Sequence, residues 1–415
     1  MPRSRETKLN GRIAFDYPAF AFYQIARFFV VASTEMQSVA VGWQVYDITH
    51  RAFDLGLVGL CQFLPGITLF LVSGHVADRF NRRTLLMLCY AGFATCSGLL
   101  LYVTHHGPPS VHAIYAVLVL LGVVRSFSGP VSRALLPQLV PEEHFPNAVA
   151  WHSTVFQAST ILGPSIGGLV YAAFHGPSAV YATAVASTGI AIVCTTLIRP
   201  NVVARVREPI SLSTVLAGLR YIKQQKIILG SISLDLFAVL LGGAVALLPV
   251  YAREILHTGP WGLGLLRTAP GVGAAAMAVF LAYRPLQGRV GATMLWCVGG
   301  FGAFTIVFGL SRNLVLSLLA LILVGASDMV SVVIRVTLLQ LMTPDQMRGR
   351  VNAVDMVFIG ASNELGQFES GLTASWFGTV PAVILGGIGT LIVTAIWAWS
   401  FPELRRADKL TASGN

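Results

Sequence analysis

Twelve apolar segments constrain this chain more than any other feature of its sequence. A helix needs about 20 predominantly apolar residues to cross a hydrocarbon core of about 30 Å. The segments lie near residues 17–46, 54–74, 83–104, 111–136, 146–174, 178–198, 227–253, 260–283, 291–311, 313–341, 350–377 and 380–401. Only 11% of the 415 residues are charged, against about 25% in a typical soluble domain. The sequence therefore predicts an all-α membrane protein with twelve transmembrane helices, surrounded by membrane lipid.

Lysine and arginine are distributed unevenly between the loops on the two sides. Cytoplasmic loops of membrane proteins are enriched in these residues. If the N-terminus is cytoplasmic, the inner side collects Arg3, Arg5, Lys8, Arg12, Arg79, Arg82, Arg83, Arg199, Arg205, Arg207, Arg220, Lys223, Lys226, Arg284, Arg289, Arg348, Arg350, Arg405, Arg406 and Lys409. The outer side keeps Arg51, Arg253 and Arg312. We therefore expect a multi-pass protein of the cytoplasmic membrane with both termini in the cytoplasm.

Several classes of function find no support in the sequence. The net charge of +10 is scattered over short loops without interleaved aromatic residues, so it does not indicate a nucleic-acid partner. The five cysteines all lie in predicted spans and lack the CxxC spacing of a zinc site. Neither a GxxxxGKS/T phosphate loop nor an HExxH motif is present. We expect no metal, no cofactor, no enzymatic activity and a monomeric protein.

The longest polar interval, residues 199–226, divides the chain into two halves of six predicted helices each. Its second part, from Ser211, has apolar residues at helical spacing, and we expect an amphipathic helix on the cytoplasmic membrane surface there. The predicted units are an N-terminal bundle over 1–198, a linker over 199–226, a C-terminal bundle over 227–401 and a cytoplasmic tail over 402–415.

A weak internal repeat relates the two halves. RALLPQLVPEEHFPNAVA (133–150) is similar to RVTLLQLMTPDQMRGRVNA (335–353), so that Arg133 corresponds to Arg335. With a one-residue slip, Gly163 corresponds to Gly366 and Gly168 to Gly371. Duplicated six-helix units are typical of secondary transporters, whose small-molecule substrate binds between the halves near the bilayer midplane.

The stretch GHVADRFNRR follows the second predicted helix, and we expect a ten-residue cytoplasmic loop there. A glycine permits close approach of a neighbouring helix, and an aspartate is stabilised by a helix N-terminus or an arginine. The stretch resembles the signature loop of the major facilitator superfamily, G-x-L-a-D-r-x-G-r-r, at Gly74, Asp78, Arg79, Arg82 and Arg83. It departs at His75, Val76 and Asn81, and the missing second glycine predicts a less forgiving turn. The resemblance implies a gating loop; topology-setting charge is the alternative.

The fourth predicted helix contains LGVVRSFSGPVSRALLP, with Arg125 in its apolar portion. A charge there is costly and normally faces a protein interior or water. The pattern resembles the fourth-helix motif of the superfamily, an arginine followed four residues later by glycine, here Arg125 and Gly129. The resemblance implies a role for Arg125 in proton coupling. A structural partner for a buried carboxylate is the alternative.

The fifth predicted helix contains TILGPSIGGLVY. Gly163, Pro164, Gly167 and Gly168 place a kinkable segment with a small-residue face in the membrane, which neighbouring helices must pack against. The segment resembles the G-P-x-x-G-G motif of the superfamily's antiporters, which marks exporters more than importers. Ordinary small-residue packing is the alternative.

The first two predicted helices, VAVGWQVYDITHRAFDLGLVGLCQFLPGITLFLVSGHVADRFNRR, are similar to the drug:proton antiporter 3 branch, which includes macrolide and siderophore exporters. The resemblance implies proton-coupled export of small amphiphilic compounds, such as drugs or siderophores, by alternating access. The alternative on the same fold is an uncoupled facilitator or a lipid or metabolite transporter.

Ionisable residues inside predicted spans are functional candidates because exposure to lipid is so unfavourable. They are Arg27, Glu35, Arg125, Asp235, Asp328, Arg335, Glu364 and Glu369. Glu35 is the first candidate for proton coupling, and a fixed ion pair with Arg125 or Arg27 is its alternative. Asp328 and Arg335 share a helix face but lie about 10 Å apart along the axis, too far to pair directly. Asp235 is expected to pair with a cation or to form a cytoplasmic gate.

Glu364 and Glu369 are five residues apart and so project about 140° from each other. Glu369 shares a stripe with Asp355 and Ser362, whereas Glu364 shares one with Gly360 and Gln367. We expect one glutamate to face the central cavity, where it binds a proton or a cationic substrate. The other is expected to anchor its helix against neighbouring helices.

Overall fold

The computed structural model describes residues 11–106, 110–199, 212–286 and 288–407. Within these residues the secondary structure is helical, without strands. The α-helices are α1 (Pro18–Thr49), α2 (Ala52–Thr68), α3 (Phe70–Arg79), α4 (Arg82–His105), α5 (Val111–Leu135), α6 (Phe145–Ala173), α7 (Pro177–Leu197), α8 (Leu212–Gln224), α9 (Lys226–Gly242), α10 (Leu248–Val250), α11 (Gly259–Tyr283), α12 (Val290–Leu310), α13 (Leu314–Met342), α14 (Asp345–Phe377), α15 (Thr379–Ser400) and α16 (Pro402–Arg405). Short 3-10 helices cover Ile13–Asp16, Leu136–Gln138, Glu142–His144 and Ala244–Leu247, and Tyr251–Ile255 form a π-helix. The chain start, residues 200–211 of the predicted linker and the end of the predicted tail lie outside the described residues.

Each of the twelve predicted apolar segments coincides with one or more of these helices. Among the described residues, eight helices are long and apolar enough to cross a membrane: Arg82–His105, Val111–Gln138, Pro177–Leu197, Lys226–Ile255, Gly259–Tyr283, Val290–Leu310, Leu314–Met342 and Thr379–Ser400. Helices α1, α6 and α14 are as long but more polar, because they carry residues such as Glu35, His152 and Glu364. The twelve-span prediction is compatible with this architecture.

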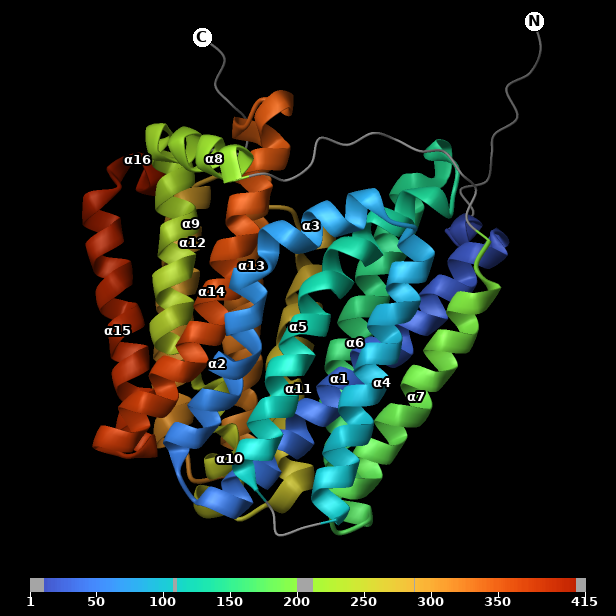
Figure 1. Cartoon of the computed structure of the whole chain (residues 1–415). Helices are drawn as coiled ribbons and strands as arrows, with labels where there is room; N and C mark the ends of the chain where they lie inside the picture. The colour runs from blue at the N-terminus through green and yellow to red at the C-terminus, as the bar shows by residue number, and fades with distance from the viewer. Residues whose placement is uncertain (1–10, 107–109, 200–211, 287, 408–415) are drawn as a thin grey trace, which may run out of the picture.

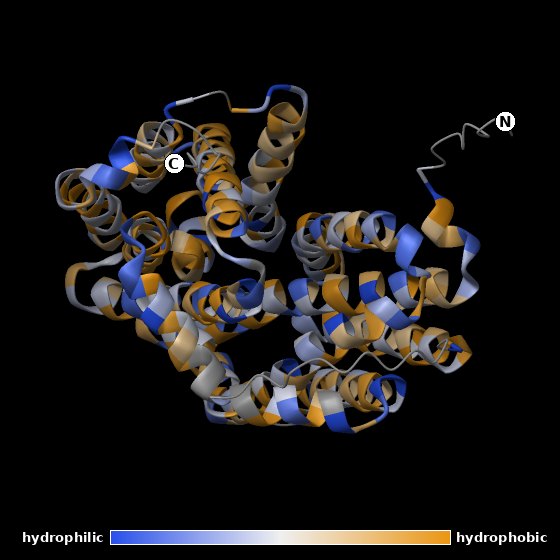
Figure 2. Cartoon of the chain, turned by 90° about the horizontal axis from the view of Figure 1, so that it is seen from above, coloured by the Kyte–Doolittle hydropathy of each residue, from blue (hydrophilic) through white to orange (hydrophobic). Residues whose placement is uncertain are grey.

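Many large apolar side chains are exposed, as lipid contact requires. Trp296 and Trp399 are 82% and 81% exposed, and Leu169 and Val193 are 61% and 60% exposed. Soluble monomers rarely expose apolar surface on this scale. The long helices run side by side, as the view along the bundle shows (Figure 2).

The start of α1, α8 and α16 lie at one end of the bundle, which we call the terminal end (Figure 1). The turn from α1 to α2, the turn from α14 to α15, and α10 lie at the opposite end, which we call the far end (Figure 1). The predicted amphipathic helix corresponds to α8, which lies across the terminal end and packs on α14 and α9. Lys226 Nζ at the start of α9 lies 2.8 Å from Glu403 Oε1 of α16.

Two pairs of glycines bring helices from the two halves of the sequence into backbone contact toward the far end. A Cβ atom added to Gly168 of α6 would lie 2.6 Å from Pro260 O and 2.9 Å from Gly264 Cα of α11. A Cβ added to Gly371 of α14 would lie 2.7 Å from Gly56 Cα of α2. Such distances leave no room for a side chain. Because Gly168 and Gly371 correspond in the internal repeat, the same contact occurs twice, once on each side of the bundle.

A methyl group at Gly168 is expected to open this far-end contact. Overpacking costs about 1–3 kcal/mol. This cost changes the ratio of molecules with the far-end contact closed to molecules with it open about 5–150-fold. The measurement is the distance between spin labels at His50 and Trp376 in a variant without native cysteines, where Gly168→Ala should enrich long distances. The control is Gly98→Ala on α4, because an added Cβ there has no neighbouring atom within 4 Å. An unchanged distance distribution for Gly168→Ala would show that the glycine contact does not hold the far end closed.

The predicted ten-residue loop after the second apolar segment is wrong. Residues through Arg79 belong to α3, and only Phe80 and Asn81 separate α3 from α4. The Asn81 side chain accepts hydrogen bonds from the backbone N–H groups of Arg83 (3.0 Å) and Thr84 (3.2 Å), so it caps α4. Its φ of −62° is available to any residue. Asparagine therefore replaces the expected glycine without strain and stabilises the following helix.

Candidate functional site

Two carboxylates and two arginines from four helices meet near the middle of the bundle. Arg125 Nη1 of α5 lies 3.6 Å from Glu364 Oε1 of α14. Arg267 of α11 donates a hydrogen bond to Ser38 Oγ of α1 (2.6 Å). Glu35 of α1 and Glu364 each interact electrostatically with both arginines. We call Glu35, Arg125, Arg267 and Glu364 the charge quartet.

The small residues of α6 position Glu35. A Cβ on Gly163 would lie 2.6 Å from Glu35 Cβ and 2.8 Å from Ala32 O, and a Cβ on Gly167 would lie 2.7 Å from Met36 Cα. Gly168, one residue further, instead faces α11. The GPSIGG segment therefore packs against both the helix that carries Glu35 and the helix that carries Arg267.

The charge quartet is balanced and links the two halves of the chain. Each half contributes one acid and one base, so the ionised quartet has no net charge. The Arg125 side chain is 53% exposed and that of Glu364 is 18% exposed, so their pair is only partly desolvated. A partly hydrated pair exchanges partners at lower cost than a dry one. Protonation of either carboxylate would leave one excess positive charge and weaken the attraction between the halves.

Glu364 and Glu369 have different surroundings. Glu364 faces Arg125 of the other half and accepts a hydrogen bond from Gln367 Nε2 (3.2 Å). Glu369 is half-buried and accepts a hydrogen bond from Thr373 Oγ1 one turn later (2.7 Å). Among the described residues no cation lies within ion-pairing distance of Glu369. Of the two glutamates, Glu364 is therefore the one that pairs with a cation of the other half in the described structure.

A second group of charges lies within the C-terminal half. Arg335 of α13 is 3% exposed, lies 3.3 Å from Asp235 Oδ2 of α9, and also pairs with Asp355 of α14. We call Asp235, Arg335 and Asp355 the acidic triad. Asp328 lines the same cavity of about 280 Å³ as Asp235 and Arg335 without pairing directly with Arg335 in the described structure. This agrees with the spacing argument from the sequence.

The far end carries a further set of links between the halves. The Tyr46 hydroxyl donates to Glu254, and Arg253 pairs with Asp47. The Arg253 guanidinium also lies 6.0 Å from the centroid of Trp43. Arg253 and Glu254 both belong to the π-helix Tyr251–Ile255. A π-helix is often found at functional sites.

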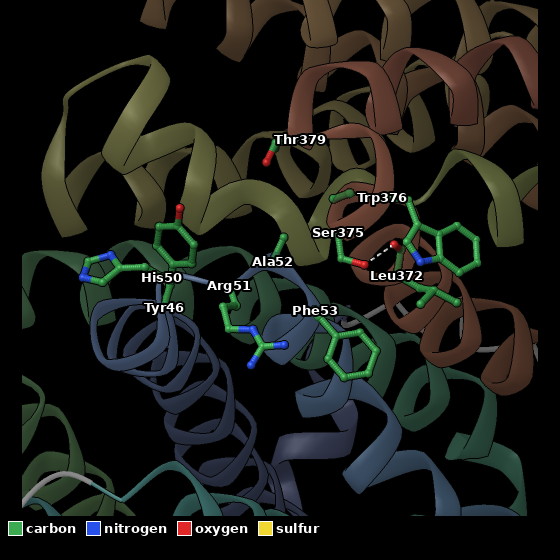
Figure 3. A pocket seen from close by; sticks show the side chains of 10 residues that line it. Tyr46, His50, Arg51, Ala52, Phe53, Leu372, Ser375, Trp376 and Thr379 are labelled. Atoms are coloured by element: carbon green, nitrogen blue, oxygen red, sulfur yellow. Dashed lines mark hydrogen bonds between the residues drawn. The ribbon is translucent and has the colours of Figure 1, made fainter.

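A pocket of about 550 Å³ lies beside these links, at the far end (Figure 3). Tyr46, His50, Arg51 and Phe53 line one side, and Leu372, Ser375 and Trp376 line the other. It is larger than the cavity beside the acidic triad but contains no carboxylate and lies apart from the charge quartet. We regard it as a surface recess formed where the two halves meet.

Comparison with known proteins places this architecture in a family. The profile described as transmembrane secretion effector, within the major facilitator proteins, matches residues 13–413. The chain belongs to the transmembrane secretion effector family. A relative from Escherichia coli O6:K15:H31 (strain 536), named enterobactin exporter EntS, is 28% identical over 98% of both chains. The enterobactin exporter EntS of Citrobacter koseri is 29% identical over 96% of this chain and 95% of that protein.

Solved structures confirm the fold of this secretion effector. The POT family transporter PepTSo has a TM-score of 0.74 at 11% identity, covering 94% of this chain and 98% of that chain. A bacterial homologue of the lysosomal transporter Spinster, inward-facing and occupied, has a TM-score of 0.73 at 11% identity, covering 94% and 97%. At such identities the likeness concerns the fold alone. The predicted all-α major facilitator fold is confirmed.

The predicted gating residues of the secretion effector lie at the terminal end, apart from the charge quartet. Arg83 donates to the carbonyl oxygens of Thr195 (3.1 Å) and Thr196 (2.5 Å) and so satisfies the last carbonyls of α7. Arg79 is exposed, and Gly74 is buried within α3. The Arg82 Nε atom has no hydrogen-bond partner in the described structure. The side chain of Asp78 lies outside the described part of the secretion effector.

Sequence reasoning missed Arg267 and gave Asp355 no role of its own. Arg267 interrupts the apolar run GLGLLRTAPGVG, so the criterion that identified Arg125 would have found it. Asp355 lies near the polar start of its segment, where an acid is unremarkable in sequence. Its importance depends on Arg335 of a neighbouring helix, which only the packing shows.

Proposed function

We propose that this secretion effector is a proton-coupled exporter that moves small amphiphilic compounds, foremost siderophores, across the cytoplasmic membrane by alternating access. The observation that carries the proposal is the charge quartet, because it joins titratable groups of both halves inside the helix bundle. Intramembrane acids facing a protein interior mark proton and substrate pathways. The names of the relatives support a siderophore as cargo. The positive-inside pattern supports cytoplasmic termini.

In this mechanism the described structure is the state closed at the far end. Cargo enters from the terminal end, while the glycine contacts and the Tyr46–Glu254 and Asp47–Arg253 links keep the far end shut. Protonation of Glu35 or Glu364 from the far side unbalances the quartet, and release of that proton to the cytoplasm restores it. Because the quartet spans the halves, its charge biases their equilibrium.

The alternative is an uncoupled facilitator or a lipid or metabolite transporter. Arg335 of the acidic triad is almost fully buried, which favours a structural role for at least some intramembrane carboxylates. If Glu35 and Glu364 are likewise held as structural partners of the quartet's arginines, no proton enters the cycle.

Transport into proteoliposomes distinguishes these functions. With enterobactin as the cargo and the lumen more acidic than the bath, molecules whose terminal end faces outward should accumulate cargo at least tenfold above equilibrium. Without the pH gradient, the internal concentration should only reach that of the bath. Empty liposomes are the control for leakage. Equilibration at the same level with and without the gradient would contradict proton coupling and favour the facilitator.

A further inference from the structure

Two arginines in the N-terminal half have no carboxylate partner among the described residues. Arg27 of α1 and Arg133 of α5 interact electrostatically with each other, and neither forms an ion pair in the described structure. Arg27 donates to the carbonyl oxygen of His152 on α6. Arg133 is exposed, and its guanidinium contacts Met356 of α14, so it faces the other half. A partly buried cation such as Arg27 is costly unless a counter-charge is supplied. Arg133 adds a second positive charge at the surface that faces α14.

The equivalent positions of the C-terminal half carry that counter-charge. Arg133 corresponds to Arg335 in the internal repeat. His152 and Asp355 lie eleven residues before the corresponding glycines, Gly163 and Gly366.

The first helices of the two halves can be matched through the same glycines. A Cβ on Gly163 would meet Ala32 Cα at 3.3 Å, and a Cβ on Gly366 would meet Leu240 Cα at 3.3 Å. Arg27 and Asp235 each lie five residues before these contact residues. The acidic triad is therefore matched by Arg27, Arg133 and His152.

The two matched triads have opposite charge. In the C-terminal half, two carboxylates enclose one buried arginine and leave excess negative charge. In the N-terminal half, two arginines surround a histidine whose Nδ1 atom is buried without a hydrogen-bond partner in the described structure. One half is thus internally paired, whereas the other is open to an anion.

Aromatic rings flank Arg27 and His152. The Arg27 guanidinium lies 5.2 Å from the centroid of Phe156. The His152 ring is stacked on Tyr23 with centroids 5.8 Å apart and an interplanar angle of 3°. Guanidinium groups bind carboxylate, sulfonate and similar oxyanions in bidentate fashion, and aromatic faces pack against flat ligands. Tyr23 is fully buried, so the partly exposed ring of Phe156 is the aromatic surface that an anion with an aromatic ring would meet beside Arg27.

We propose that Arg27, Arg133 and His152 form an anion-binding subsite for an aromatic anion, which is the class of compound the protein exports. The assignment to cargo rests on the proposed function, whereas binding of the anion does not. An anionic cargo bound by these arginines differs from the cationic substrate that the sequence led us to expect at one of the two glutamates.

A matched pair of probes tests the subsite directly. 8-Anilinonaphthalene-1-sulfonate and N-phenyl-1-naphthylamine share their aromatic rings, but only the first carries a sulfonate. Binding to the full chain in lipid nanodiscs is measured by equilibrium dialysis, with empty nanodiscs subtracted. We expect the anion to bind at least tenfold more tightly than the neutral probe. Arg27→Gln and Arg133→Gln should each weaken anion binding about tenfold and change binding of the neutral probe less than twofold.

Two controls separate charge from packing. Arg27→Lys and Arg133→Lys keep the charge and should retain anion binding within about threefold of the native protein. Arg284→Gln removes an exposed arginine at the end of α11 and should change neither probe. Equal losses for both probes, or anion binding unchanged in the double Arg27→Gln, Arg133→Gln variant, would overturn the subsite.

Enterobactin transport by the same variants keeps the two proposals apart. If the native protein does not transport enterobactin but the arginine dependence of anion binding holds, the cargo proposal fails and the subsite stands. If the double variant transports enterobactin at the native rate and binds the anion normally, the subsite fails and the proposed function stands.

Discussion

Replacing Arg335 by methionine is expected to lower the free energy of unfolding by about 3–5 kcal/mol. The side chain is 3% exposed and is shared between Asp235 and Asp355. Without it, two buried carboxylates face each other with no compensating cation, and each must bind a proton or draw water into the bundle. The measurement is unfolding by sodium dodecyl sulfate titration in mixed micelles.

Removal of the whole acidic triad is the informative control. Replacing a buried ionic group by apolar residues of similar size is often neutral or stabilising. The triple variant Asp235→Leu, Arg335→Met, Asp355→Leu should therefore recover most of the stability that Arg335→Met loses. A loss below about 1 kcal/mol for Arg335→Met alone would show that the triad is hydrated and adds little to stability.

Replacing Glu35 by glutamine is expected to abolish accumulation driven by a pH gradient while leaving exchange of cargo intact. Glutamine keeps the shape and the packing on Gly163 but cannot bind and release a proton. Accumulation in proteoliposomes should fall at least tenfold, to the level reached without a gradient. Counterflow, which requires only alternating access, should stay within about threefold of the native rate.

Matched glutamine variants locate the coupling residue. Glu364→Gln removes the partner of Arg125 in the same quartet and should impair coupling as well. Glu369→Gln leaves the quartet unchanged, because Glu369 bonds to Thr373 of its own helix, and should keep coupling. Full gradient-driven accumulation by both Glu35→Gln and Glu364→Gln would show that neither carries the proton.

Hydropathy was enough to predict the fold, because each helix must satisfy its own backbone in lipid and bury about 20 apolar residues. The same argument marked Glu35, Arg125 and Arg335 as unusual. It offered Arg125 or Arg27 as a partner for Glu35 but did not pair Arg125 with Glu364, which lies more than two hundred residues away in the chain. The local turn at Asn81 was predicted wrongly, since a family pattern suggested glycine where a capping side chain serves the same connection.

The repeat added information that hydropathy lacks. It related Gly168 to Gly371 before the structure showed that both allow backbone contact with the opposite half. Repeat alignment alone did not indicate that Arg133 and Arg335 would differ in burial and in the charge of the groups around them. That difference depends on Arg27, Asp235, His152 and Asp355, whose positions on neighbouring helices are set by packing.

The paired glycine contacts also affect whether protons can pass between the two halves at the far end. Where α6 meets α11 and α2 meets α14, backbone lies against backbone, with no ionisable group between them. A proton crosses a protein by hopping along titratable side chains or a file of water molecules, and neither fits into these contacts. In the proposed proton-coupled cycle, these helix crossings would therefore keep protons from leaking past the closed far end.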